Sequence, residues 1–163
     1  MKASLGIFLL LASTAAFADQ KGAPAARLHA SAIQIDVVKV GDVSIPAEFQ
    51  YAIYERLIEQ VRAAGIFKTV YRSGDKAAAN VPDLVTLKTA VDAFQEGSQT
   101  KRELAPVVVG NTRVDVTAQV VDKDGKTVFD QKVAGKVRIF GENLGATNDL
   151  AKRITKLLVA NFY

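Results

Sequence analysis

The residues best suited to contact another molecule lie in one long stretch, residues 95–111, between two predicted strands. Two adjacent cations there are followed by a run of valines. Guanidinium and ammonium groups bind carboxylates or phosphates, and an apolar run buries area or adds a strand by backbone pairing. Loops of this length in a compact domain are often functional. The partner-binding candidates are Lys101, Arg102, Val107, Val108 and Val109. The competing interpretation is that the valines begin the next strand and the charges are only solvated.

Carboxylates are the groups in this chain that best suit acid–base chemistry. Glycoside hydrolysis needs two facing carboxylates, and Asp92 and Asp115, on neighbouring predicted strands, are the pair that would have to supply them. The chain has no cysteine and one histidine, His29, which excludes thiol nucleophiles, disulfides and multi-histidine metal sites. Asp122 and Asp124 resemble part of a calcium loop, but the closing glutamate is missing and the Asp-Gly step favours a turn. We therefore expect no catalytic, cofactor-binding or metal-binding residue, and a protein that is not an enzyme.

Residues 1–18 have the pattern of a cleavable signal peptide. A short basic start at Lys2 precedes an apolar stretch and a small-x-small motif that ends at Ala18. The apolar stretch is well short of the ~20 residues that a spanning helix needs. We expect cleavage between Ala18 and Asp19, export to the periplasm or the exterior, and no membrane span in the mature chain.

The rest of the chain has the composition of one ordinary domain. Apolar residues make up 49% of the sequence, which excludes a disordered chain. The 21 basic residues barely exceed the 17 acidic ones, so we expect no nucleic-acid partner. Residues 19–31 are rich in Ala, Gly, Pro and Gln and predict a flexible lead-in. Residues 32–163 are expected to form a single α+β domain.

Period-two alternation predicts the strands of that domain. They are expected at residues 33–38, 66–72, 84–94, 113–120 and 129–139. In the third of these, the alternation places Ala93 on the side of Leu87 and Phe94 on the opposite side. The turn at residues 122–126 is expected to join the last two strands into a hairpin.

Two amphipathic helices are expected to cover this sheet. The first follows Pro46, has its apolar stripe centred on Leu57 and ends at a C-cap, Gly65. The second, residues 148–162, has a stripe that includes Leu157, and we expect both leucines in one core. Because both helices have one apolar face, the predicted fold is a two-layer α+β sandwich, with a mostly antiparallel sheet of about five strands and two helices on one face.

The order of these elements resembles a known family. The run from Tyr54 to Val70 looks like the helix-Gly-Val/Ile-Phe-x-x-Val module of a family of secreted bacterial domains of unknown function. The downstream segments 83–85, 94–98 and 120–126, with the two cations in the loop, follow the same layout. The module is more distantly similar to the periplasmic domains of the curli secretion channel and of the outer-membrane lipoproteins that activate penicillin-binding proteins. This resemblance implies an assembly or partner-binding unit.

Three functional hypotheses follow. The first is a non-catalytic interaction or assembly module of the bacterial cell envelope, with an envelope protein as partner and a homo-oligomer permitted. The second is a periplasmic small-ligand binding protein, and the third is a carboxylate-dependent hydrolase. A large concave pocket beside Asp92 and Asp115 would favour the hydrolase, whereas a shallow surface with an exposed apolar patch would favour the interaction module. We take the interaction module as the expected function, without cofactors.

Overall fold

The fold is a mixed sheet covered by two helices, seen in a computed structural model that describes residues 27–98, 111–137 and 143–163. The strands are β1 (Ala32–Ile35), β2 (Lys39–Val40), β3 (Thr69–Arg72), β4 (Leu84–Gln95), β5 (Thr112–Val121) and β6 (Thr127–Val137). The helices are α1 (Ala47–Ala64), the short 3₁₀ helix η1 (Lys76–Asn80) and α3 (Gly145–Asn161). Among the described residues, no helix is both long enough and apolar enough to cross a membrane.

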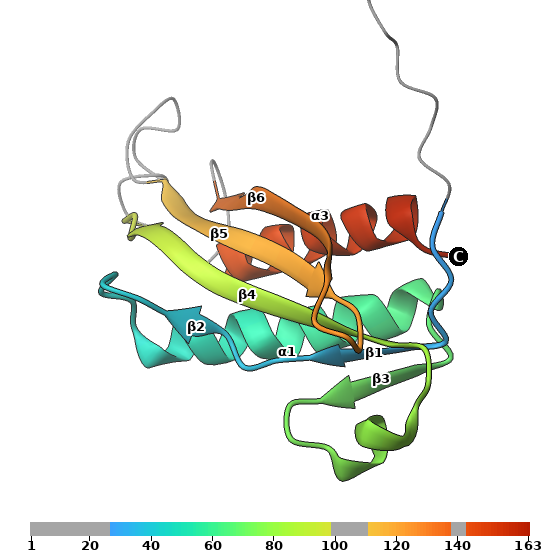
Figure 1. The fold of residues 1–163 in the computed structure, drawn as a ribbon. Helices are drawn as coiled ribbons and strands as arrows, with labels where there is room; N and C mark the ends of the chain where they lie inside the picture. The colour runs from blue at the N-terminus through green and yellow to red at the C-terminus, as the bar shows by residue number, and fades with distance from the viewer. Residues whose placement is uncertain (1–26, 99–110, 138–142) are drawn as a thin grey trace, which may run out of the picture.

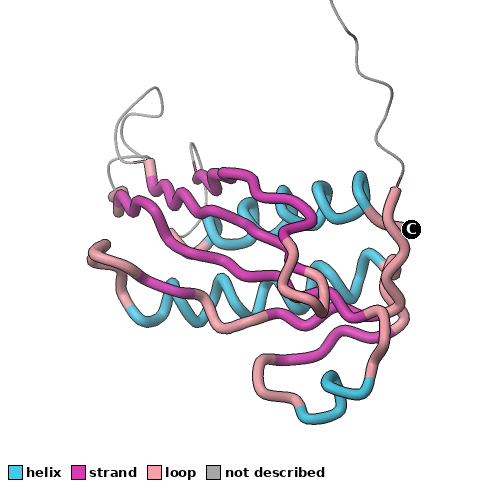
Figure 2. Tube along the Cα trace, viewed as in Figure 1, coloured by secondary structure: helices cyan, strands magenta, loops and turns pink. Residues whose placement is uncertain are grey.

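The elements form two layers, as Figures 1 and 2 show. The sheet has the order β3-β1-β4-β5-β6, and β2 pairs with β4 beyond the end of β1. Helices α1 and α3 lie side by side on the same face of the sheet. The opposite face of the sheet is not covered by either helix. The predicted α+β sandwich with both helices on one face is therefore confirmed.

The sheet differs from the prediction in being mixed and six-stranded. β1 pairs in parallel with β3 and β4, and β2 pairs in parallel with β4. β4, β5 and β6 pair antiparallel, and the predicted hairpin between β5 and β6 is confirmed. The parallel part arises because α1 connects β1 and β2 to β3, and a helical crossover returns the chain in the direction in which it left.

The core lies between the helices and the sheet. Leu57 of α1 is fully buried, as predicted, and Leu158 of α3 is as well. The prediction for Leu157 is wrong, because this side chain is only half-buried. It lines a surface groove between α3 and the outer edge of β6, beside Gln131 and Val133. Successive helical residues point about 100° apart, so only one of the two adjacent leucines faces the sheet directly.

A β-bulge in β4 reverses the predicted alternation of buried and exposed side chains at the end of that strand. The pairing with β5 shifts register between Val91 and Ala93, so Asp92 is the extra residue. Ala93 is therefore exposed instead of buried. Phe94, expected on the solvent side, packs edge-to-face against Phe49 of α1 with ring centroids 4.8 Å apart. Ala93 and Phe94 therefore lie on the faces opposite to those predicted.

The residues before β1 are attached to the domain. Leu28 pairs with Phe162, and its amide donates to the Asn161 carbonyl at 2.7 Å. Ser31 donates two hydrogen bonds to the Asp83 carboxylate, one from its hydroxyl and one from its backbone amide. Both hydrogen bonds hold the pKa of the Asp83 carboxyl below its ordinary value, and the one from the Ser31 hydroxyl has the larger effect.

The low pKa of Asp83 predicts an acid-dependent loss of stability. A carboxyl with a depressed folded-state pKa stabilises the fold at pH values above its unfolded pKa, and this stabilisation is lost as the pH falls from about 4 through the folded pKa. Asp83→Asn is expected to flatten the dependence of the melting temperature on pH in this acid range. Thermal melts from pH 6 to pH 2 test this, and parallel curves for the variant and the wild type would contradict it.

Candidate functional site

The partner-binding candidates of the sequence all lie outside the described residues. This holds for Lys101, Arg102, Val107, Val108 and Val109, and equally for the cleavage-site residues Ala18 and Asp19. The structure does describe both ends of the candidate loop, at residues 95–98 and 111–112. These ends lie at the same end of the sheet, where β4 ends and β5 begins (Figure 1).

A chain of hydrogen bonds joins the ends of two connections at this place. The Gly97 amide donates to Thr112 Oγ1 at 3.1 Å, and this hydroxyl donates to Asn143 Oδ1 at 2.9 Å. Asn143 Nδ2 in turn donates to Glu96 Oε1 at 3.3 Å and to the Gly97 carbonyl at 3.2 Å. We call Glu96, Gly97, Thr112 and Asn143 the loop-end network. It fixes the base of the β4–β5 loop to the residues just before α3.

Neither Thr112 nor Asn143 was predicted from the sequence to belong to a functional site. Both are single polar residues next to a strand or helix, a position that many surface residues share. Thr112 is fully buried, however, although the residues on either side of it are polar. A buried hydroxyl requires a hydrogen-bond partner, and Asn143 supplies it from 31 positions away.

Replacing Thr112 tests how much the loop-end network contributes. Thr112→Val keeps the shape of the side chain but removes the hydrogen bonds of the hydroxyl with Gly97 and Asn143, so we expect the free energy of unfolding to fall by about 1–3 kcal/mol. Thr117→Val is the matched control, because its hydroxyl makes an exposed hydrogen bond and should cost less than about 0.5 kcal/mol. Urea denaturation measures both, and equal losses would mean that the buried network contributes no more than one exposed hydrogen bond.

The two carboxylates that the hydrolase hypothesis needs do lie close together. Asp92 and Asp115 line one depression of about 350 Å³ on the uncovered face of the sheet, next to the loop end. Asp92 lies on this face because it follows the buried Val91 in the strand alternation, and the bulge adds Ala93 to the same face, since it places two successive side chains on the same side. Lys132 of β6 closes the depression on the other side.

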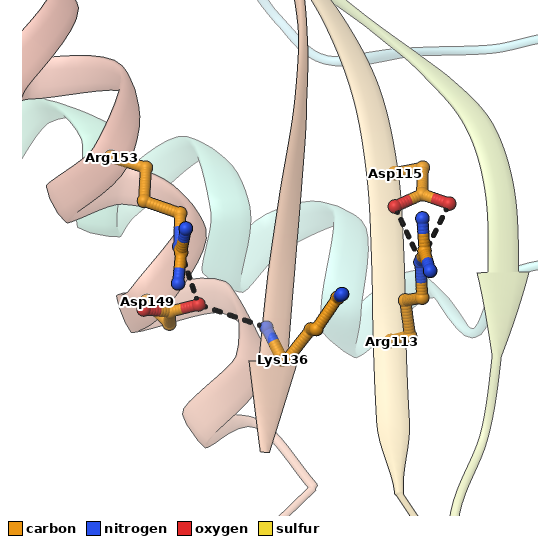
Figure 3. A network of polar contacts seen from close by, with 5 residues as sticks. All are labelled: Arg113, Asp115, Lys136, Asp149 and Arg153. Carbon is orange, nitrogen blue, oxygen red and sulfur yellow. Dashed lines mark hydrogen bonds and ion pairs between the residues drawn. The ribbon is translucent and has the colours of Figure 1, made fainter. Parts of the chain in front are cut away.

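Each of these carboxylates is already bound by a neighbouring side chain. Arg113 Nε donates to both oxygens of Asp115, at 2.8 and 2.9 Å (Figure 3). The hydrogen bond with Asp115 raises the pKa of Arg113, which favours the charged form of the guanidinium. Thr117 Oγ1 donates to Asp92 Oδ2 at 2.8 Å. This arrangement forms a polar surface with fixed charges, which suits recognition of another molecule better than proton transfer.

Residues 122–126 form the turn between β5 and β6, as predicted. Asp122 Oδ1 accepts hydrogen bonds from the amides of Asp124 and Lys126, at 3.0 and 2.8 Å. Gly125 has φ of +81°, a conformation that glycine adopts without strain. Within the described ranges no cluster of three His, Cys, Asp or Glu side chains is arranged to hold a metal ion.

One protein-family model matches this chain. Residues 43–141, more than half of the chain, match the model of DUF4410, a domain of unknown function. The protein therefore belongs to the DUF4410 family. The matched range begins just before α1, includes β3 to β6 and ends after β6, so it contains four of the six strands and both ends of the β4–β5 loop, while β1 and β2 lie before it. No curated protein matches the chain.

Solved structures share the fold at low sequence identity. The PelC dodecamer from Paraburkholderia phytofirmans is 14% identical with a TM-score of 0.61, covering 82% of this chain and 89% of PelC. A dodecamer of a point variant of PelC from the same organism is 13% identical with a TM-score of 0.62, covering 87% and 96%. A hypothetical protein from Chlamydia trachomatis is 10% identical with a TM-score of 0.48, covering 80% and 94%. The two PelC similarities show that this chain and PelC share a fold.

Proposed function

We propose that this protein is a non-catalytic, exported module of the bacterial cell envelope that assembles with copies of itself and with an envelope protein. The observation that carries the proposal is the fold it shares with PelC, a dodecamer, over most of both chains. The proposal keeps the more distant resemblance to the periplasmic domains of the curli channel and of the penicillin-binding-protein activators, which are assembly units as well.

The surface of the molecule supports recognition over catalysis. The uncovered sheet face presents fixed charges, and the depression there is at the small end of ligand pockets, which typically measure about 300–1,000 Å³. Its two carboxylates are engaged by Arg113 and Thr117. The loop-end network holds the two described ends of the β4–β5 connection, residues 95–98 and 111–112, at the end of the sheet next to this charged face.

Export is the part of the proposal that rests on sequence alone. It follows from the signal-peptide pattern that ends at Ala18. Sequencing the N-terminus of the protein recovered from the periplasm is expected to begin at Asp19. Recovery of uncleaved protein in the membrane fraction would contradict this part of the proposal.

Two measurements on the exported protein test the assembly function. Light scattering coupled to size-exclusion chromatography is expected to give a mass several times that of one chain. Crosslinking in cells followed by mass spectrometry is expected to recover the same envelope protein in repeated experiments. A monomer at every concentration, together with no reproducible crosslinked partner, would overturn the proposal.

Substitution of the two cations in the β4–β5 loop tests whether these residues contact the partner. Changing Lys101 and Arg102 together to Ala is expected to lower recovery of the crosslinked partner while leaving the melting temperature nearly unchanged. The matched control changes Lys152 and Lys156, two exposed cations of α3, to Ala. Partner recovery at the wild-type yield from the loop variant would exclude these two charges from the contact.

A further inference from the structure

The outer edge of β6 is an unpaired strand edge. β6 has 11 residues and stands last in the strand order, with no strand beyond it among the described residues. Such an edge presents backbone N–H and C=O groups that pair readily with another chain, unless the protein blocks them. The accessible part of this edge is therefore a candidate for contact with a second molecule.

Among the described residues, a contact from α3 blocks one end of the edge. The Lys136 amide points outward and donates to Asp149 Oδ2 of α3 at 3.0 Å, and Arg153 Nε holds the same oxygen at 2.9 Å (Figure 3). In an antiparallel ladder, amides two residues apart point the same way. The amides of Ala134 and Lys132 therefore point outward too, and no described residue is hydrogen-bonded to them.

A groove with a mixed polar and apolar lining runs along this open part of the edge. It has a volume of about 310 Å³ and is lined by residues of β6 and α3, among them Val133 and the half-buried Leu157. Lys132 and Lys136 place positive charge beside it, while Asp149 and Arg153 neutralise each other. No ion pair involves either lysine within the described part of the chain. We call Lys132, Val133, Lys136 and Leu157 the β6–α3 edge.

The other edge of the sheet, at β2 and the start of α1, has exposed apolar and acidic side chains. Gln50 Nε2 donates to the Val38 carbonyl at 2.7 Å, which brings the start of α1 beside the connection between β1 and β2. Next to these two residues, Val37 and Tyr51 are 55% and 67% exposed, both unusually high for large apolar side chains.

Two acidic residues lie in the same part of the chain, Asp42 shortly before α1 and Glu48 in the first turn of α1. Asp42 and Glu48 are exposed and form no ion pair with any described residue. Lys39 is the one cation on β2 and offsets part of this charge. We call Val37, Asp42, Glu48 and Tyr51 the β2–α1 edge. It lies on the side of the sheet away from β6 (Figure 1).

We propose that the β6–α3 edge of one copy packs against the β2–α1 edge of the next copy, head to tail. The lysines of the β6–α3 edge meet Asp42 and Glu48 of the next copy, and the exposed Val37 and Tyr51 pack against Leu157. An interface between two different surfaces repeats from copy to copy and closes into a ring when the rotation permits. This inference rests on the proposed self-assembly and names the surfaces that carry it.

Strand direction is compatible with this arrangement. β6 runs parallel to β4, because each is antiparallel to β5, and β1, β2 and β3 are parallel to β4 as well. The strands at both edges of the sheet therefore point the same way. A rotation about an axis along the strands keeps that direction, so edges of neighbouring copies meet in the parallel orientation already present within one copy.

Charge reversal on each edge tests the proposal. Variant A carries Lys132→Glu and Lys136→Glu, and variant B carries Asp42→Lys and Glu48→Lys. Each variant alone opposes like charges at the interface, so its mass by light scattering is expected to fall to that of a monomer, with affinity weakened at least about tenfold. An equimolar mixture of A and B restores opposite charges at both junctions and is expected to recover the wild-type mass with both chains present.

A control variant and the wild type separate the outcomes. Lys152→Glu with Lys156→Glu makes the same charge change as variant A on the exposed side of α3 and should leave the mass unchanged. Wild-type protein that is itself monomeric would overturn the proposed self-assembly. If the wild type is oligomeric, unchanged mass for A and B would overturn only the assignment of the edges. Monomeric A and B that stay monomeric when mixed would overturn the head-to-tail arrangement.

Disulfide trapping keeps the test decisive if a charge variant fails to fold. The chain has no cysteine, so every introduced thiol is unique. Val37→Cys and Lys132→Cys in one chain are expected to give a ladder of covalent multimers on oxidation. Either change alone is expected to give no ladder. Absence of a ladder from an oligomeric double variant would overturn the proposed contact.

Discussion

Gly135→Ala is expected to lower the free energy of unfolding by about 3 kcal/mol, the upper end of the usual cost of overpacking. Gly135 lies on β6 where the first turn of α3 crosses the strand. A Cβ there would collide with the Ala146 carbonyl oxygen and would lie 2.6 Å from Leu150 Cβ and 2.9 Å from Leu150 N. Two of these three atoms belong to the backbone of α3, so the helix itself would have to move.

Gly41→Ala is the matched control for this prediction. No atom lies within 4 Å of the position that its Cβ would occupy, and its φ is not positive. We expect a change of less than about 0.5 kcal/mol, because the new methyl group meets open space and the unfolded chain loses some freedom. Urea denaturation of both variants measures the difference. Equal stability of the two would mean that α3 packs more loosely on β6 than the structure shows.

The sequence was sufficient to predict α1, α3 and five of the six strands, but not the short elements β2 and η1 or the way the strands pair. Amphipathic stripes and period-two alternation depend on residues that are close along the chain, so α1, α3 and the β5–β6 hairpin were predicted correctly. The parallel pairing of β1 with β3 and β4 depends on contacts up to about 50 residues apart, which no local pattern reports. The bulge at Asp92 was missed for the same reason, since it is defined only by the register with β5.

The candidate site was predictable where its contacts are local. Arg113 and Asp115 are two residues apart on one strand, so their side chains share a face and their ion pair follows from spacing. The loop-end network joins Glu96 and Gly97 to Thr112 and Asn143 across as many as 47 residues. Its members are ordinary polar residues when taken singly, and only the fold brings them together.

Leu57→Ala is expected to cost about 2–5 kcal/mol, because this side chain is fully buried between α1 and the sheet and its loss leaves a cavity. Leu158→Ala should cost a similar amount, since Leu158 is buried equally well from α3. Leu157→Ala should cost only about 1 kcal/mol, because a half-buried side chain loses less apolar contact with the protein. Chemical denaturation of all three variants measures these differences.

The pair Leu157 and Leu158 also links stability to assembly. If Leu157 forms the floor of an interface, Leu157→Ala weakens association although the monomer remains nearly as stable as the wild type. Leu158→Ala should do the reverse, destabilising the monomer while leaving the edge surface intact. Denaturation at a protein concentration low enough to populate monomers, followed by light scattering at a high concentration, separates the two effects. Equal losses of monomer stability for both leucines would show that Leu157 belongs to the core after all and is not free to meet a second copy.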